Sequence, residues 1–214
     1  MTTFFTYYGQ KCMVPYLKEQ ADLGAKFAII DDGSPEPLEK VEGIECYRIN
    51  EDIKWNQTGA KNLGFHVLDG WIMHCPIDMR LSAEGFKALD QIDKQIGTVY
   101  YIAYANSTRV VPICEGAHDI FIMHKSDFEK SGGFDEDLSG HYGWEDLLFH
   151  SVCLTYFKTA DIDSVHVVHE PKGQTVGLAR DPTETQKLFL HKLHRLAAGK
   201  METTPKLRFT WRKL

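Results

Sequence analysis

The sequence predicts an α/β fold with a mixed, mostly parallel central sheet and helices on both faces. Short apolar runs, rich in aromatic and β-branched residues, alternate with longer amphipathic stretches through the first half of the chain. Turns that contain Asp, Gly, Ser and Pro follow several of these runs. The length of 214 residues, with 43% apolar and 25% charged residues, fits one globular domain. We expect that domain at residues 1–199, followed at 200–214 by a basic tail or linker that could lead into a further domain.

Seven strands are predicted from the apolar runs. The second of them ends at the acid pair Asp31 and Asp32, and Pro76 ends the fourth because proline lacks a backbone donor. The predicted strands are Thr3–Tyr8, Lys26–Ile30, Cys46–Ile49, Trp71–Cys75, Val99–Tyr104, Ile120–His124 and Val165–His169.

Five helices are predicted from stretches whose apolar residues recur every three or four positions. Glu145 and Asp146 open one of them, at the end where the helix dipole favours negative charge. The predicted helices are Pro15–Leu23, Asn56–Leu68, Ala83–Ile96, Glu145–Tyr156 and Thr183–Ala198.

Composition and charge argue against several classes of protein. The formal net charge of −6 disfavours nucleic-acid binding, which needs a basic balance or a basic stripe. No segment approaches the roughly 18 apolar residues that cross a bilayer, and no secretory signal is recognisable. The five cysteines are odd in number, widely spaced and form no C-x-x-C pair. We therefore expect a cytoplasmic protein in a reducing compartment.

Acidic residues follow two of the predicted strands. Asp31 and Asp32 come after one strand and Asp78 after another, so we expect them on the rim where open α/β sheets bind ligands. Carboxylates there can accept hydrogen bonds from a base or ribose, and Asp78 can ligate Mg²⁺ or Mn²⁺. The alternative is that these residues only cap turns.

Two glycines, Gly59 and Gly64, lie inside a predicted helix and flank Lys61 and Asn62. Glycine costs helix stability, so it often marks a close ligand or close packing. Lys61 could meet a phosphate and Asn62 a ribose or sugar hydroxyl. The alternative is a helix packed tightly on the sheet with an exposed lysine.

The longest constellation begins with Gly132–Asp137 and continues with Gly143–Asp146. Its glycines form a loop, and Trp144 offers a face on which a sugar ring can stack. Glu145 and Asp146 can bind hydroxyls or accept a proton. The alternative is an acidic helix start beside a core tryptophan.

His166 and His169 lie on a late predicted strand. One neutral imidazole can complete a Mn²⁺ site that a carboxylate and two phosphate oxygens begin. Residues three apart on a strand face opposite ways, so at most one of the two points at the site. The alternative is a pair of ordinary histidines.

In this order, these segments resemble the GT-A glycosyltransferases, in particular the family 2-like group, over roughly residues 3–170. Asp31–Ser34 resembles the acidic nucleotide-binding turn of the family, and Ala60–Gly64 its Ala-Arg-Asn-x-Gly helix. Trp71–Asp78 lies where the Asp-x-Asp strand belongs, and Phe128–Asp146 is similar to the acceptor segment. A fainter similarity, to a glycosyltransferase domain of chlorella-infecting viruses, implies the host cytoplasm.

Two residues depart from the pattern of the family. Lys61 replaces the usual arginine, which keeps the charge but loses a bidentate grip on phosphate. Pro76 replaces the first acid of Asp-x-Asp, and Asp78 remains at the position that ligates metal.

The resemblance implies transfer of a sugar from a nucleoside-diphosphate sugar, with UDP as the expected nucleotide, to a hydroxyl of a glycan or glycoprotein. Asp78 and His169, with His166 as second choice, would hold Mn²⁺ or Mg²⁺ on the diphosphate. Asp146, beside Glu145, would be the base of an inverting reaction. In a retaining reaction the carboxylates would stabilise an oxocarbenium-like centre instead. Trp144 and Gly133 would contact the substrate. The nucleotide would be held by Thr6, Tyr7, Tyr8, Asp31, Asp32, Lys61 and Asn62.

Two other functions remain open from the sequence. A GT-A fold that kept its sugar or nucleotide pocket but lost catalysis would explain Pro76. A nucleotidyltransferase shares the sheet and the metal-bound nucleotide, but usually has a Gly-rich phosphate loop after the first strand. Here that position reads Tyr8–Cys12, with one glycine.

Overall fold

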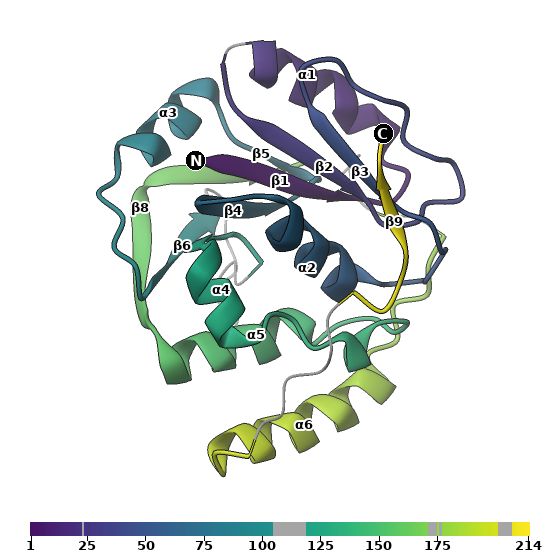
Figure 1. Cartoon of the computed structure of the whole chain (residues 1–214), viewed down its shortest axis with the longest axis vertical. Helices are drawn as coiled ribbons and strands as arrows, with labels where there is room; N and C mark the ends of the chain where they lie inside the picture. Colours follow the sequence, from purple (N-terminus) through teal and green to yellow (C-terminus); the bar gives the residue numbers. More distant parts are fainter. Residues whose placement is uncertain (23, 105–118, 171–174, 176, 201–206) are drawn as a thin grey trace.

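A nine-stranded sheet organises the residues that the computed structural model describes, which are 1–22, 24–104, 119–170, 175, 177–200 and 207–214 (Figure 1). The strand order is β5-β8-β6-β7-β4-β1-β2-β3-β9. Six of these strands run in one direction, and β5, β7 and β9 run in the other. The strands are β1 Thr2–Tyr7, β2 Phe27–Asp31, β3 Glu45–Ile49, β4 Trp71–Pro76, β5 Met79–Arg80, β6 Thr98–Tyr104, β7 Phe121–His124, β8 Lys158–His169 and β9 Trp211–Lys213.

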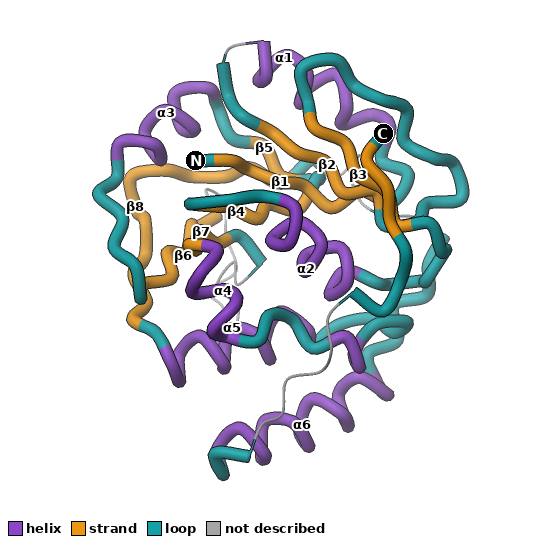
Figure 2. The backbone as a smooth tube through the Cα atoms, in the orientation of Figure 1, coloured by secondary structure: helices purple, strands orange, loops and turns teal. Residues whose placement is uncertain are grey.

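Alternation along the central strands directs apolar side chains to both faces of the sheet. On β1, Phe5 joins one buried cluster with Met13, Leu17 and Phe86, whereas its neighbour Phe4 joins the other. The first face is covered by α1 (Val14–Asp22) and α3 (Ala83–Gln91). The second is covered by α2 (Gln57–Val67), α4 (Lys125–Ser131) and α5 (Glu145–Tyr156), as Figure 2 shows. The predicted α/β class, with a mostly parallel sheet between helices, is confirmed.

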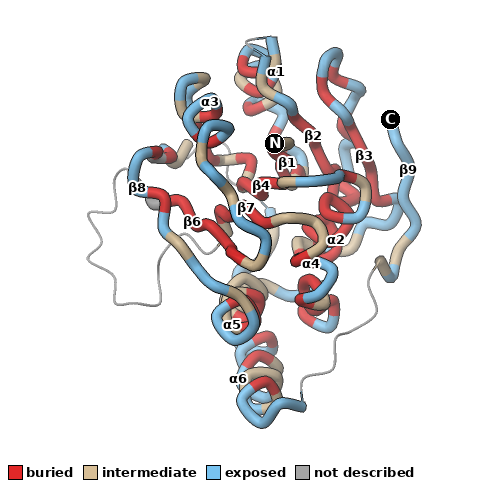
Figure 3. The backbone as a smooth tube through the Cα atoms, turned by 60° about the vertical axis from the view of Figure 1, so that its left-hand side comes forward, coloured by how far each residue is buried: buried red, intermediate tan, exposed pale blue. Residues whose placement is uncertain are grey.

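Helix α6 (Thr183–Ala197) packs on α5 rather than on the sheet. Phe189 of α6 is buried with Leu138 and Leu148, Thr185 and Leu196 are also buried, and Figure 3 shows exposed residues between them. A short 3₁₀ turn at Glu136–Leu138 lies between α4 and α5, and another at Lys11–Met13 precedes α1.

Several boundaries differ from the prediction. Helix α3 ends at Gln91 instead of Ile96, because Ile92 adopts extended backbone angles. Strand β8 begins at Lys158, seven residues before the predicted start, in a polar segment that pairs with β6. Strand β5 and helix α4 were not predicted, since neither has the length or the periodicity that marks an element.

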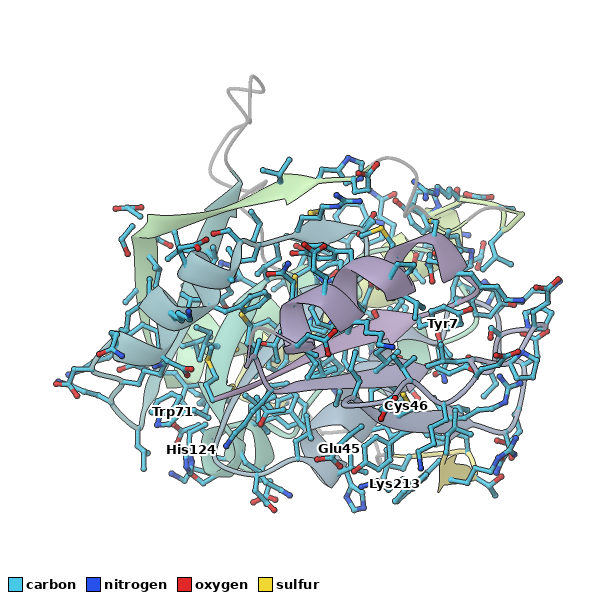
Figure 4. The ribbon with its side chains drawn as sticks, turned by 90° about the horizontal axis from the view of Figure 1, so that it is seen from above. Tyr7, Glu45, Cys46, Trp71, His124 and Lys213 are labelled. Atoms are coloured by element: carbon cyan, nitrogen blue, oxygen red, sulfur yellow. The ribbon has the colours of Figure 1, made fainter. Side chains whose placement is uncertain are left out.

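The segment predicted as a basic tail or linker ends in a strand. β9 pairs antiparallel with β3, and Lys213 forms an ion pair with Glu45 at 2.7 Å across that edge (Figure 4). In the middle of the sheet, Trp71 and His124 contact each other across the β4–β7 pair, with ring centres 5.3 Å apart.

Within the described part of the chain, no helix is long and apolar enough to span a membrane. The four cysteines described there, Cys12, Cys46, Cys75 and Cys153, are free thiols. Cys114 lies outside the described residues.

Candidate functional site

A cavity of about 360 Å³ opens at the carboxyl ends of β1 and β4 and at the start of α5. Its wall includes five residues that the sequence predicted for the site, namely Thr6, Asp78, Trp144, Glu145 and Asp146. The location agrees with the rule that open α/β sheets bind ligands beyond the carboxyl ends of their strands.

Glu145 and Asp146 form an acidic pair in the first turn of α5. The preceding residue, Trp144, has a φ of 72°, and its ring stacks on Phe189 with centres 5.0 Å apart. Burial and the neighbouring charge of Asp146 raise the pKa of Glu145 to about 7. The pair therefore includes one carboxyl group, that of Glu145, which is partly protonated at neutral pH.

Lys61 of α2 lies beneath this acidic pair. Its ammonium group contacts the Asp146 carboxylate and is 3.8 Å from Glu145 Oε1. The side chain is only 1% exposed, so the predicted alternative of an exposed lysine is wrong. In this position Lys61 faces carboxylates instead of the predicted phosphate.

Asn62 and Gly133 lie behind the cavity and shape the neighbouring loop. The Asn62 side chain accepts from the Phe134 amide at 2.9 Å and donates to the Phe134 carbonyl at 3.0 Å and to Glu136 at 2.7 Å. Gly133 is buried at a φ of 74°, and its amide donates to Ser131. Neither residue is among the described residues that line the cavity: Asn62 holds Phe134 in place and Gly133 bonds to Ser131, so their contacts with ligand stay predictions.

Asp31 is the last residue of β2, one position inside the strand rather than after it, and Asp32 follows it; the two differ in their surroundings. Asp31 accepts from the amides of Ser34 and Leu38, both at 2.9 Å, and forms an ion pair with Arg48. Both of its oxygens are therefore occupied, as the turn-capping alternative predicted. Asp32 is 4% exposed, and its Oδ1 has no hydrogen-bond donor among the described residues. Burial raises the pKa of Asp32 well above its usual range.

The two tyrosines at the end of β1 also differ. Tyr7 is fully buried, and its hydroxyl has no hydrogen-bond partner among the residues described. Tyr8 is half-buried and donates to Asp52 at 2.7 Å. A base could therefore stack on Tyr8 but not on Tyr7, which lies in the core.

Asp78 and His169 meet beside the cavity because β5 pairs with the end of β8. His169 Nε2 is 3.4 Å from Asp78 Oδ2, and Met79 lies opposite His169 in the ladder. Burial raises the pKa of Asp78, an effect that His169 partly offsets. The side chain of His166 lies outside the described residues.

The Asp78–His169 pair fits Mn²⁺ in the type of its donors, since the ion accepts carboxylate oxygen and imidazole nitrogen. No group of three or more His, Cys, Asp or Glu in the described parts of the chain could hold a metal alone. A cation here would need further oxygen ligands from the substrate.

One wall of the cavity was not predicted from the sequence. Trp55 and Tyr142 have ring centres 4.8 Å apart, and the Arg180 guanidinium lies 5.9 Å from the first ring and 5.7 Å from the second. Asp119 also lines the cavity. Trp55, Tyr142 and Arg180 are far apart in sequence and belong to no motif, so only the fold brings them together.

No protein-family model matches the chain, and no curated protein matches its sequence. Solved structures do match its fold. TarS 1-349 of S. aureus in complex with UDP-GlcNAc has a TM-score of 0.68 at 13% identity, over 96% of this chain and 68% of that one. The fold is that of the GT-A glycosyltransferases.

Two further structures have the same fold. The catalytic domain of Drosophila β1,4-galactosyltransferase 7, in complex with xylobiose, has a TM-score of 0.59 at 13% identity, over 97% of this chain and 82% of that one. GalNAc-T7 with UDP, GalNAc and Mn²⁺ has a TM-score of 0.59 at 13% identity, over 87% of this chain and 47% of that one. In another TarS 1-349 structure the chain spans 66% of the length. The predicted GT-A fold is confirmed, and the family 2-like group and the viral source stay predictions.

Proposed function

We propose that this protein is a glycosyltransferase that moves a sugar from a nucleoside-diphosphate sugar, with UDP as the nucleotide, to a hydroxyl of a glycan or glycoprotein. The observation that carries the proposal is one cavity with two acidic sites: a pair of carboxyl groups, and a carboxyl group beside a histidine. Glu145 and Asp146 line one wall, and Asp78, backed by His169, lines another. The structures with this fold that contain UDP-GlcNAc, or UDP with Mn²⁺, support the choice of donor.

Asp146 is the base in this proposal. The acceptor hydroxyl donates its proton to the Asp146 carboxylate as its oxygen attacks the anomeric carbon of the donor sugar, and the nucleoside diphosphate leaves. Glu145, with its pKa raised to about 7, can hold a hydroxyl group as donor or acceptor at neutral pH. Trp144, stacked on Phe189, presents a rigid aromatic face to the sugar ring.

The donor site in this proposal lies at the ends of β1, β2 and β4. Thr6 lines the cavity, and behind it Asp32 has an oxygen, Oδ1, that no described residue donates to and that a nucleoside donor would bind. Arg180 is the one Lys or Arg among the described residues that line the cavity, so it would face a bound diphosphate, and its charge also acts on Asp78.

A divalent cation would assist the reaction. Among the described residues, the carboxyl groups of Asp78, Asp119, Glu145 and Asp146 line the cavity with Arg180. This balance repels a diphosphate unless positive charge is added. When bound by Asp78 and His169, Mn²⁺ or Mg²⁺ would supply that charge and stabilise the leaving diphosphate.

The test combines calorimetry and transfer assays on the whole chain. UDP, other nucleoside diphosphates and their sugars are titrated with Mn²⁺ or with EDTA into the wild type, Asp78→Asn, Asp146→Asn and the control Asp163→Asn. Asp163 is an exposed acid on β8, so its variant should match the wild type. We expect UDP binding that requires metal and Asp78. We also expect Asp146→Asn to bind donor normally but transfer sugar about 10²- to 10⁴-fold more slowly.

Binding that ignores both EDTA and Asp78→Asn would contradict metal assistance. The absence of nucleotide binding by the wild type would contradict the proposed function as a whole. NMR of the product would assign its anomeric configuration and separate an inverting from a retaining reaction.

One observation favours a second function, a binding module without catalysis. Pro76 occupies the first acidic position of the Asp-x-Asp strand and lines the cavity, so the chain supplies only Asp78 there. Metal-dependent binding of a UDP-sugar with neither transfer nor hydrolysis in the wild type would support this alternative.

A further inference from the structure

A lysine without access to solvent lies under the floor of the cavity. Lys61 belongs to α2, which approaches the sheet closely at Gly64, where a Cβ would overlap the Phe4 ring. The Lys61 ammonium lies 4.9 Å from the centre of the Phe134 ring. Among the described residues Lys61 is not part of the cavity wall, so its partners are protein groups.

The groups that face this ammonium come from four elements. Asp146 and Glu145 approach from α5 and Asp119 from the turn before β7, whereas Asp32 follows β2 and His74 lies on β4. Burial alone would lower the pKa of Lys61, but Asp146 and Glu145 outweigh it and raise the pKa. Burial and the Lys61 charge lower the pKa of His74 to about 3, so His74 stays neutral. Lys61 is thus the cation that faces the acidic pair from below.

Two effects favour binding of a proton by the acidic pair formed by Glu145 and Asp146. The two carboxyl groups repel each other as anions, and both are largely shielded from water, with 14% of the Glu145 side chain and 26% of the Asp146 side chain exposed. Tyr101 of β6 also interacts with Asp146 and is itself buried and neutral, because burial raises its pKa. Among the described residues, the buried Lys61 charge opposes this tendency.

We propose that Lys61 is a positioning residue, whose buried ammonium holds the Asp146 carboxylate at the cavity floor and keeps it ionised beside Glu145. This role rests on the proposed function, in which Asp146 must be a carboxylate to accept a proton. It differs from a phosphate contact because the Lys61 charge acts through Asp146 and never touches the substrate.

The test is a ¹³C NMR titration of the carboxyl groups in the wild type, Lys61→Met, Lys61→Arg and Lys192→Met. Lys192 is a matched control, since it is also largely buried and paired with two acids, Asp135 at 2.6 Å and Asp137 at 2.5 Å. In Lys61→Met we expect the acidic pair to titrate about one pH unit or more higher than in the wild type. In Lys61→Arg the pair should titrate near its wild-type pH. Lys192→Met should be less stable than the wild type, but its acidic pair should titrate at the wild-type pH.

The acid limb of the kcat/KM profile for transfer should move upward by the same amount in Lys61→Met. If Lys61 has only a structural role, Lys61→Met will lower stability but change neither the NMR titration nor the pH dependence of kcat/KM. That result would overturn the proposal. If Lys61→Met does not fold, Asp146→Asn is compared with the double variant Lys61→Met/Asp146→Asn, which leaves no unpaired buried charge. Glu145 must then titrate at higher pH in the double variant, and equal titration would overturn the proposal.

The two proposals fail in different ways. A wild type that transfers no sugar with any donor contradicts the proposed function, while the NMR titration still decides whether Lys61 controls the ionisation of the pair.

Discussion

At the scale of single residues, a sequence motif does not reveal which of its polar atoms already have hydrogen-bond partners within the protein. Asp31 and Asp32 are adjacent, yet Arg48 and two backbone amides occupy Asp31, whereas none of the described residues donates to Asp32 Oδ1. Five of the residues predicted for the site, Thr6, Asp78, Trp144, Glu145 and Asp146, line one cavity. The sequence could not distinguish the ligand-facing residues from the supporting ones, because that depends on partners far away in the chain.

At this scale we predict that Glu145→Gln stabilises the folded protein at pH 8. Burial raises the pKa of Glu145 from 4.5 to about 7, so the folded state binds the proton more tightly than the unfolded state does. Stability from this group is present below pH 4.5 and is lost as pH rises through 7. The variant should be more stable by about 1–3 kcal/mol at pH 8 and nearly equal to the wild type at pH 4. Urea unfolding of the variant and the wild type at pH 4 and pH 8 measures this. The same difference in unfolding free energy at both pH values would contradict the prediction.

Among the elements, α2 determines how closely the site is built onto the sheet. Its two glycines were correctly read as marks of close approach, since Gly64 lies against the Phe4 ring on β1. The elements with strong periodicity were predicted within a few residues, as α5 and α2 show. Strand β8 was half missed, because its polar first half is held by pairing with β6 rather than by its own pattern.

We predict that Gly64→Ala destabilises the protein by about 1–3 kcal/mol, although alanine favours a helix over glycine. The added methyl would overlap the Phe4 ring, which is fully buried and cannot move aside. Gly85→Ala in α3 is the control, since its Cβ would meet the Leu81 side chain at 2.9 Å and Val165 at 3.5 Å instead of an aromatic ring. The melting temperature of Gly64→Ala should be well below that of Gly85→Ala, and equal melting temperatures would contradict this explanation.

Across the whole molecule, the sheet buries ionisable groups between its helical layers. Lys61, His74 and Asp127 are each 0–1% exposed. The overall class and the mostly parallel sheet could be predicted because alternating elements leave few arrangements. The Trp55–Tyr142–Arg180 wall could not, since no local pattern connects residues that only the fold brings together.

We predict that His74 makes the molecule sensitive to acid. Burial and the charge of Lys61 lower the pKa of His74 from 6.5 to about 3, so below pH 6.5 the unfolded state binds a proton that the folded state refuses. Stability therefore falls as pH drops from 6.5 toward 3, by up to about 1.4 kcal/mol per pH unit. His74→Gln should be less stable than the wild type at pH 8 but lose less on going to pH 4. Urea unfolding of both proteins at pH 8 and pH 4 measures these differences. An equal loss of unfolding free energy in the two proteins would refute the role given to His74.

The pairing of β9 with β3 has a consequence for how the chain is made. Arg212 bonds to Asn50, which precedes it by 162 residues, so the outer side of β3 stays open while the intervening chain is synthesised. At ordinary ribosomal speeds that interval lasts about 8–30 s. An unpaired strand edge can recruit other chains during such a delay. Slow translation between β3 and β9 should therefore favour aggregation of the nascent protein, and a short peptide with the β9 sequence supplied during synthesis should suppress it.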